Sequence, residues 1–421
     1  MAAHLSEHNI QNTSDPVAAV KVPEFRNLIL GRFSFVMGLR MITTVVGWWI
    51  YQITKDPFAI GLIGLSEVIP ALSLALYSGH TVDVNDKKKI ALLMVAGYFF
   101  AAAFLYYLST PVATTTLHIK HITWFIYGVF FTTGILRSFV GPAMSSMIAF
   151  VVPRDLLQNA TTWNQGTWLS ASVSGHAVGG FLIALIGISN TFLVVCGLIA
   201  IGFFFFARLK PKPPQHLNAE QNTWQSVLDG LKFVYRTKAL LGAMAVDMFA
   251  VLFGGAVAMV PVYASDILKI GPMGFGWLNA AVDIGAIVIV VLLTLFPMKH
   301  AQGRKMLIAV AGFGVCIILF GLSKWFWLSF AALLVAGMLD GVSVVVRGTV
   351  MQLLTPDHMR GRVSSVSGMF VLSSNELGQF ESGLAAKILG VVPSVVFGGC
   401  MTLAVVITTW FKAPTLRKFD Y

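Results

Sequence analysis

The chain has 421 residues, of which 57% are hydrophobic and only 11% are charged. A soluble domain carries roughly 25% charged residues, so this composition excludes an ordinary soluble protein. The formal net charge is +11, which by itself could indicate nucleic-acid binding. The basic residues, however, lie in short loops between apolar segments. This distribution predicts that the lipid bilayer, and no nucleic acid, is the partner of the chain.

About twelve apolar segments of roughly 18 to 28 residues follow one another, and a helix of that length crosses a bilayer core. They predict helices over residues 28–53, 58–80, 90–109, 123–150, 160–188, 190–207, 239–264, 273–297, 305–322, 327–354, 362–389 and 391–412. The polar, proline-containing segment 208–238 is predicted to be a linker with a short surface helix over Trp224–Tyr235. Residues 1–27 and 413–421 are predicted to be tails.

The loop charges predict how the chain is oriented. Of the 29 Lys and Arg residues, 20 fall on the side that holds both termini, 5 on the other side and 4 inside the spans. Because basic loops stay in the cytoplasm, both termini are predicted to be cytoplasmic. The linker then separates an N-terminal bundle of six helices over 28–207 from a C-terminal bundle of six over 239–412.

The two bundles are related in sequence. A shift of 203 residues places Pro153 on Pro356, Gly175 on Gly378 and Gly180 on Gly383, and a shift of 215 places Asp56-Pro57 on Gly271-Pro272 and Gly61 on Gly276. Two parallel repeats joined by a linker are typical of secondary transporters, whose substrate site lies between the halves near the middle of the membrane. We therefore expect two pseudo-symmetric halves.

Three motifs resemble those of the major facilitator superfamily. The segment 79–89 is similar to the Gly-x-x-x-Asp-Arg-x-Gly-Arg-Arg loop after the second helix, although Val84 and Asp86 depart from it. The segment 175–180 resembles the Gly-Pro-x-x-Gly-Gly motif of antiporters, with His176 in place of proline. The runs 355–365 and 373–378 are similar to the branch that contains enterobactin exporters and macrolide efflux pumps.

This resemblance implies an all-α membrane protein with twelve transmembrane helices in two six-helix bundles, located in the bacterial inner membrane. The first, fourth, seventh and tenth helices would line a central cavity, and the second, fifth, eighth and eleventh would form the interface between bundles. The ionisable residues well inside the spans fall on these eight helices alone: Arg32, Arg40, Glu67, Arg137, His176, Asp247, Asp283, Asp340, Arg347, Glu376 and Glu381. Since a charge that faces lipid is costly, this distribution agrees with the layout.

The candidate site residues follow from these positions. The candidates for the substrate cavity are Arg40, Arg137, Asp340, Arg347, Trp49 and Phe249. Arg137 is equivalent to Asp340 under the shift of 203, so opposite charges of the two halves could form a salt bridge or a bipolar cavity. Glu67, Asp283 and His176 lie on interface helices, where a structural pair is as good an interpretation as a coupling role. Arg347 and Asp340 are seven residues apart and share a helix face.

Glu376 is the first candidate for a proton carrier, because burial disfavours the charged form of a carboxyl group. Asp247 is its rival, and Glu381 is a third candidate, about 140° around the helix from Glu376. A helix-packing role for Glu376 remains open. The resemblance assigns the cytoplasmic gate to the loop after the second helix, with Gly79, Asp83, Lys87 and Lys88.

These observations predict a secondary active exporter that moves a small organic molecule out of the cytoplasm by alternating access. The proton gradient, with a sodium gradient as the second choice, would be its energy source, since the sequence has no phosphate-binding loop for ATP. We expect a monomer with no cofactor and no metal, and no enzyme activity. A catecholate siderophore is the first guess for the substrate and a lipophilic drug the second. A metabolite uptake permease and a non-transporting sensor or scaffold are the alternatives.

Overall fold

The computed structural model describes residues 15–212, 223–298, 300–356 and 359–420, with the backbone alone for Leu76, Asp83 and residues 223–227. The long helices are α3 (Pro23–Thr54), α4 (Pro57–Val84), α5 (Lys87–Ser109), α7 (Ile119–Val151), α8 (Leu157–Ala207), α10 (Lys238–Phe253), α12 (Gly271–Leu295), α13 (Gln302–Leu322), α14 (Phe326–Leu354), α15 (Arg360–Leu389) and α16 (Val391–Lys412). The short ones are α2 (Ala18–Lys21), α6 (Pro111–Thr116), α9 (Thr223–Arg236), α11 (Val260–Val262) and α17 (Pro414–Arg417).

These described residues form no strand, and ten of their helical segments are long and apolar enough to cross a membrane. The prediction of an all-α membrane protein is therefore confirmed. The helix α15 is not among the ten, because polar side chains follow one another through its middle. The count of twelve transmembrane helices stays a prediction. The predicted surface helix of the linker corresponds to α9.

The fifth and sixth predicted spans follow one another in the structure without a separate loop. The 51 residues of α8 are two helices that meet at Gly187, which has non-helical dihedral angles of φ 80° and ψ 173°. A straight helix of that length would measure about 75 Å, far more than a bilayer core of about 30 Å. A side chain rarely adopts a positive φ of this size, so the glycine allows the chain to reverse without a separate loop.

The predicted span 239–264 is interrupted. The helix α10 ends at Phe253, and a 3₁₀ segment (Gly255–Met259), α11 and a π segment (Tyr263–Ile267) continue it. A Cβ added to Gly255 would lie 2.6 Å from the carbonyl oxygen of Gly378 on α15. The close approach of two backbones at this point excludes a larger side chain, and the helix loses its regular geometry there.

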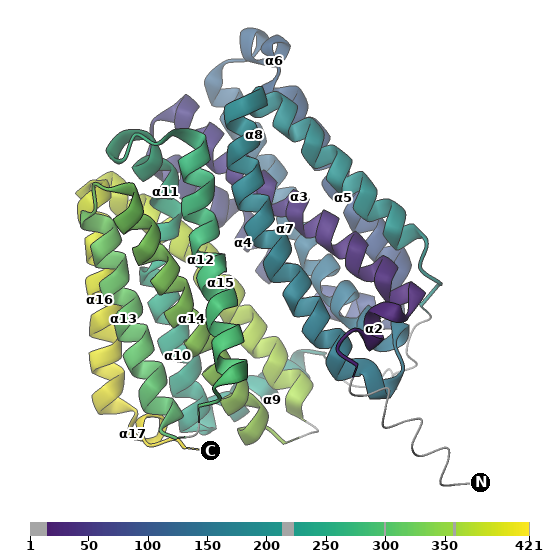
Figure 1. The fold of residues 1–421 in the computed structure, drawn as a ribbon, viewed down its shortest axis with the longest axis vertical. Coiled ribbons are helices and arrows are strands. Elements are labelled where there is room, and N and C mark those ends of the chain that lie inside the picture. The colour runs from purple at the N-terminus through teal and green to yellow at the C-terminus, as the bar shows by residue number, and fades with distance from the viewer. Residues whose placement is uncertain (1–14, 213–222, 299, 357–358, 421) are drawn as a thin grey trace.

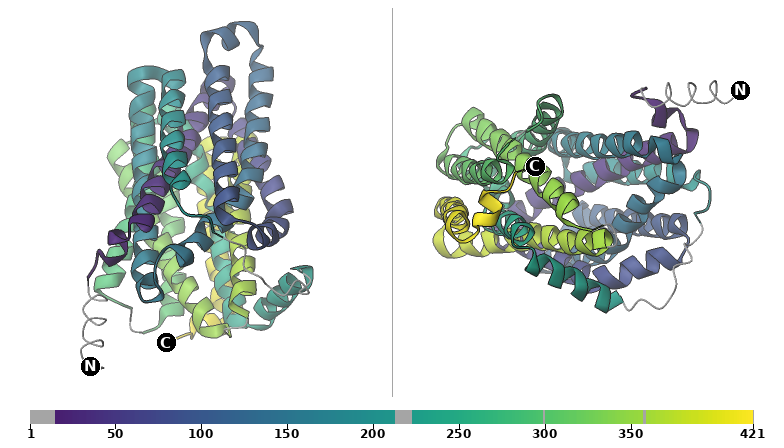
Figure 2. Two further views of the ribbon diagram at one scale, coloured as in Figure 1. Left: turned by 90° about the vertical axis from the view of Figure 1, so that its right-hand side faces the viewer. Right: turned by 90° about the horizontal axis from the view of Figure 1, so that it is seen from below.

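The helices form two groups that lie side by side, α3–α8 in one and α10–α16 in the other (Figure 2). The first and last described helices, α2 and α17, are at the same end of the molecule, which we call the terminal side (Figure 1). The opposite end is the distal side. The helices of the two groups diverge toward the terminal side.

Two pairs of glycines bring the halves into backbone contact. A Cβ on Gly180 of α8 would lie 2.7 Å from Cα of Gly276 on α12, and a Cβ on Gly383 of α15 would lie 2.8 Å from Cα of Gly61 on α4. The sequence shifts had paired Gly180 with Gly383 and Gly61 with Gly276. Exchanging the two halves therefore turns one contact into the other, as pseudo-symmetry requires.

Further contacts join the halves at the distal side. Lys387 Nζ of α15 is 3.4 Å from Asp56 Oδ2, which precedes α4. The hydroxyl of Tyr51, near the end of α3, donates a hydrogen bond to Asp266 of the π segment. Trp48 stacks on Phe275 with ring centroids 5.6 Å apart. In this conformation the distal side is closed by contacts between the halves.

Candidate functional site

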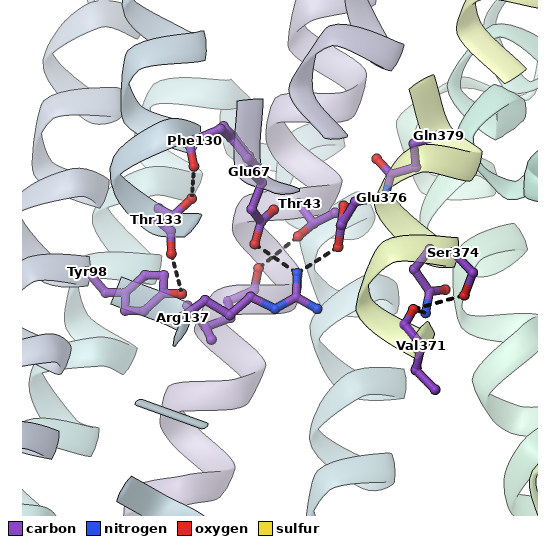
Figure 3. A network of polar contacts seen from close by, with 12 residues as sticks. Thr43, Glu67, Tyr98, Phe130, Thr133, Arg137, Val371, Ser374, Glu376 and Gln379 are labelled. Carbon is purple, nitrogen blue, oxygen red and sulfur yellow. Dashed lines mark hydrogen bonds and ion pairs between the residues drawn. The ribbon is translucent and has the colours of Figure 1, made fainter. Parts of the chain in front are cut away.

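Arg137 on α7 lies between two carboxyl groups (Figure 3). Its Nη1 is 2.8 Å from Oε1 of Glu67 on α4 and 2.6 Å from Oε1 of Glu376 on α15. The Glu376 side chain is only 6% exposed, and that of Glu67 is 14% exposed. Because Glu67 belongs to the N-terminal half and Glu376 to the C-terminal half, the guanidinium joins the two halves. We call these three residues the charge bridge.

Glycines allow the three helices that carry the charge bridge to pack closely. A Cβ on Gly64 of α4 would be 2.7 Å from the carbonyl oxygen of Glu376, so α4 and α15 meet at this level. Gly134 of α7 packs directly on the carbonyl oxygen of Glu67. Gln379 Nε2 donates to Oε2 of Glu376 at 3.2 Å. Both oxygens of Glu376 are therefore held, one by each half of the protein.

The composition of the charge bridge suits it to bind a proton. Two carboxylates and one guanidinium have a net charge of −1, and one added proton makes the cluster neutral. An arginine stays protonated under all physiological conditions, so the proton must go to a carboxylate. Since Glu376 is the carboxylate that comes from the other half, its protonation would weaken the link between halves.

A second polar cluster joins α8 to α12. Ser172 Oγ donates to Asp283 Oδ2 at 2.6 Å, and His176 Nε2 is 3.7 Å from the same oxygen. His176 Nδ1 also lies 2.7 Å from Thr44 Oγ1 on α3. The interface residues Glu67, Asp283 and His176 are thus all held between helices. Ser172 was not predicted, although its spacing of four from His176 places both on one helix face.

Asp247 and Arg347 form a buried ion pair inside the C-terminal half, between α10 and α14. Ser343 Oγ donates to Asp247 Oδ1 at 3.0 Å. The sequence placed Arg347 on the same helix face as Asp340, but in the structure the arginine binds Asp247 instead. Asp340 has no ion pair or hydrogen bond to a described side chain. The proton-carrier candidate Asp247 is therefore neutralised by a cation of its own half.

The remaining candidates are more widely separated. Glu381 contacts Ser382 Oγ at 3.5 Å and forms no ion pair within the described part of the chain. Trp49 is 4% exposed and packs edge-to-face on Phe192, inside the N-terminal half. Phe249 is 39% exposed and stacks on Phe253. These two aromatic residues do not gather at one site.

Arg40 on α3 is half-buried, and its guanidinium carbon lies 4.9 Å from the ring centroid of Trp168 on α8. A Cβ on Gly175 would be 2.6 Å from Cβ of Arg40, so a glycine allows α3 and α8 to approach here. Unlike Arg137 and Arg347, Arg40 forms no ion pair with a described carboxylate. Trp168 was not among the site residues that the sequence predicted.

The predicted gate lies where the linker leaves the N-terminal half. Lys87 is 1% exposed, its Nζ has no hydrogen-bond partner, and it lies 5.3 Å from the ring centroid of Phe150. Its backbone N–H donates to Lys212 of the linker at 3.3 Å. For Asp83 the structure describes the backbone alone. Gly79, near the end of α4, has open space around it, and the Lys88 N–H donates to Asp86 Oδ1 at 2.9 Å.

Known proteins resemble the chain over most of its length. The multidrug efflux pump Tap of Mycolicibacterium fortuitum is 21% identical over 386 residues, which cover 89% of this chain and 91% of Tap. The enterobactin exporter EntS of Escherichia coli O1:K1 / APEC is 24% identical over 408 residues, covering 94% and 93%. A crystal structure of a POT family transporter in complex with 5-aminolevulinic acid shares the fold, with a TM-score of 0.71 at 12% identity and coverage of 93% and 96%.

The family model of the Major Facilitator Superfamily matches residues 28–379. That range includes the first ten predicted spans and most of the eleventh, with all three members of the charge bridge. The chain is thus a transporter rather than an enzyme, and it belongs to the major facilitator superfamily.

Proposed function

We propose that this protein is a proton-coupled exporter that moves a small organic molecule, siderophore-like or a lipophilic drug, out of the cytoplasm by alternating access. The charge bridge carries the proposal, because one ionisable contact spans the two halves at a buried position. The names of the relatives, a multidrug efflux pump and an enterobactin exporter, support transport out of the cytoplasm.

In the conformation described, the halves meet at the distal side and diverge toward the terminal side, which corresponds to an inward-facing state of the exporter. Ionised Glu376, near the middle of α15, joins the two halves through Arg137. A proton on Glu376 replaces an ion pair with a weaker neutral hydrogen bond. The free-energy difference between the inward-facing and outward-facing conformations then depends on whether Glu376 carries a proton. Such a dependence is what couples transport to the proton gradient.

We expect Glu376→Gln to remove gradient-driven transport, because glutamine keeps the shape but can neither ionise nor release a proton. The measurement is uptake into proteoliposomes with an imposed pH gradient, with a catecholate siderophore and a macrolide as probes. The gradient-driven rate should fall by about 10²-fold or more, since a positioned proton-transfer group typically contributes about 10²–10⁴-fold to a rate. Exchange without a gradient should persist.

Glu381→Gln is the matched control, since Glu381 is on the same helix but outside the charge bridge. Its gradient-driven rate should stay close to that of the wild type. A Glu376→Gln variant that keeps full gradient dependence would overturn the assignment of the proton site. If the wild type moves neither probe under any gradient, export of these substrates is excluded and the uptake permease becomes the leading function.

We also propose that the terminal side faces the cytoplasm of a bacterial inner membrane. The loops of that side hold 20 of the 29 basic residues, against 5 on the distal side. A reporter that is active only in the cytoplasm, fused after Tyr421, should therefore be active, and the same reporter inserted in the distal loop at Lys120 should be silent. The reverse pattern would contradict the orientation.

A further inference from the structure

The arginines of the membrane helices differ in how their charge is balanced. Arg137 and Arg347 each bind a carboxylate. The Arg40 guanidinium lies beside the ring of Trp168 and forms no hydrogen bond or ion pair with a described side chain, although Asp283, Glu376 and Glu67 attract it at longer range. Arg32, eight residues earlier on α3, has a buried Nε without a hydrogen-bond partner. The first membrane helix thus carries two arginines that form no direct ion pair with a described carboxylate.

An unbalanced arginine differs from an unbalanced carboxyl group. Asp340 also has no partner in the described part of the chain, but a carboxyl group can become neutral by binding a proton. A guanidinium remains charged in a protein, and a charge inside the membrane is costly unless another group compensates it. An aromatic face compensates a cation only partly. The N-terminal half therefore offers a site for a negative group at Arg40.

The geometry also restricts the shape of the anion. The guanidinium carbon of Arg40 lies over the ring of Trp168, and the N–H groups of a guanidinium can bind two oxygens of one anion. Arg40 is half-buried and so partly accessible. A planar aromatic ring that carries the oxyanion can lie against the indole while its oxygens meet the fork. A cationic drug would face repulsion at the same place.

We infer that Arg40 and Trp168 recognise the transported molecule and that this molecule is an aromatic oxyanion, with a carboxylate or ionised phenol on a planar ring. Arg32 lies about 12 Å nearer the terminal side on the same helix and attracts the anion toward the site from that side. The inference rests on the proposed function, because it takes the space between the halves as the transport path.

The test is equilibrium binding to the full chain purified in detergent, with no gradient present. The probes are salicylate and, as a neutral compound of similar size, benzyl alcohol. The variant Arg40→Gln should lower the affinity for salicylate by about 10- to 100-fold, as expected for loss of a hydrogen-bonded charge, and should leave benzyl alcohol unchanged. Arg208→Gln is the matched control, because Arg208 also lies over an aromatic ring, that of Phe204 at 4.1 Å, but at the end of α8.

Trp168→Leu keeps the cation and removes the ring, so it provides a second test if Arg40→Gln does not fold. It should weaken salicylate binding while the affinity for acetate stays the same. Equal salicylate binding by wild type, Arg40→Gln and Trp168→Leu would overturn the inference, and so would benzyl alcohol binding as tightly as salicylate.

The outcome is separable from that of the transport assay. Salicylate binding that depends on Arg40, without gradient-driven transport of any probe, supports the site and contradicts the proposed function. Gradient-driven transport by a protein that binds no aromatic anion overturns the site alone.

Discussion

Arg137→Gln is expected to destabilise the folded protein strongly, because this one cation neutralises two carboxylates. The variant leaves Glu67 and Glu376 facing each other without a cation, and both side chains are largely buried. Removing one partner of a buried ion pair costs about 3–5 kcal/mol. We expect about 3 kcal/mol here, because the Arg137 side chain is 41% exposed and water screens part of the charge.

Thermal unfolding in detergent measures the loss of stability in Arg137→Gln. Repeating the measurement at several pH values tests whether the loss is electrostatic. The loss should be largest at neutral and alkaline pH and shrink as the medium is acidified, because protonation removes the repulsion between the carboxylates. The triple variant Arg137→Gln, Glu67→Gln, Glu376→Gln should recover much of the stability. Arg154→Gln, at an exposed position on the terminal side, should unfold like the wild type. A loss that is independent of pH would argue against an electrostatic cause.

Gly180→Val is expected to abolish transport while each half stays folded. The added side chain would meet the backbone of α12 at Pro272 and Gly276, which cannot rotate away. The halves must then separate at the distal side. Overpacking typically costs roughly 1–3 kcal/mol, which would shift the equilibrium between the closed and open distal side by about 5- to 150-fold.

The distal opening can be followed by labelling a cysteine placed at Ser265, in a chain without its three native cysteines, with a membrane-impermeant maleimide. Labelling should be faster in Gly180→Val and, by pseudo-symmetry, in Gly383→Val. Gly166→Val is the control on the same helix, because nothing lies within 4 Å of the position of its Cβ. Unchanged labelling together with normal transport in Gly180→Val would show that this contact does not limit the conformational change.

The repeat in the sequence determined more than the division into halves. It paired Gly180 with Gly383 and Gly61 with Gly276, and these four glycines are among the residues at which the halves touch. The positions of the charges likewise indicated the interface helices, since lipid excludes ions from the outer faces. The position of the charges can be read directly from the sequence, because charged side chains are costly where a helix faces lipid.

The partners of the charges were decided by the tertiary structure. Sequence spacing placed Arg347 and Asp340 on one face of a helix, but α10 brings Asp247 to Arg347 at that depth. Glu376 was selected from the sequence as a buried carboxyl group, yet nothing in its spacing indicates Arg137, which is 239 residues away.

The sequence by itself determined the membrane class, the two related halves and the helices that carry charge, because hydrophobicity and periodicity act locally along the chain. Only the tertiary structure decided which charges form ion pairs and which, like Arg40, form none with a described side chain. Helix rotation and depth set those pairs, and each residue of rotation turns a side chain by about 100°. That choice depends on the packing of neighbouring helices rather than on the order of residues within one.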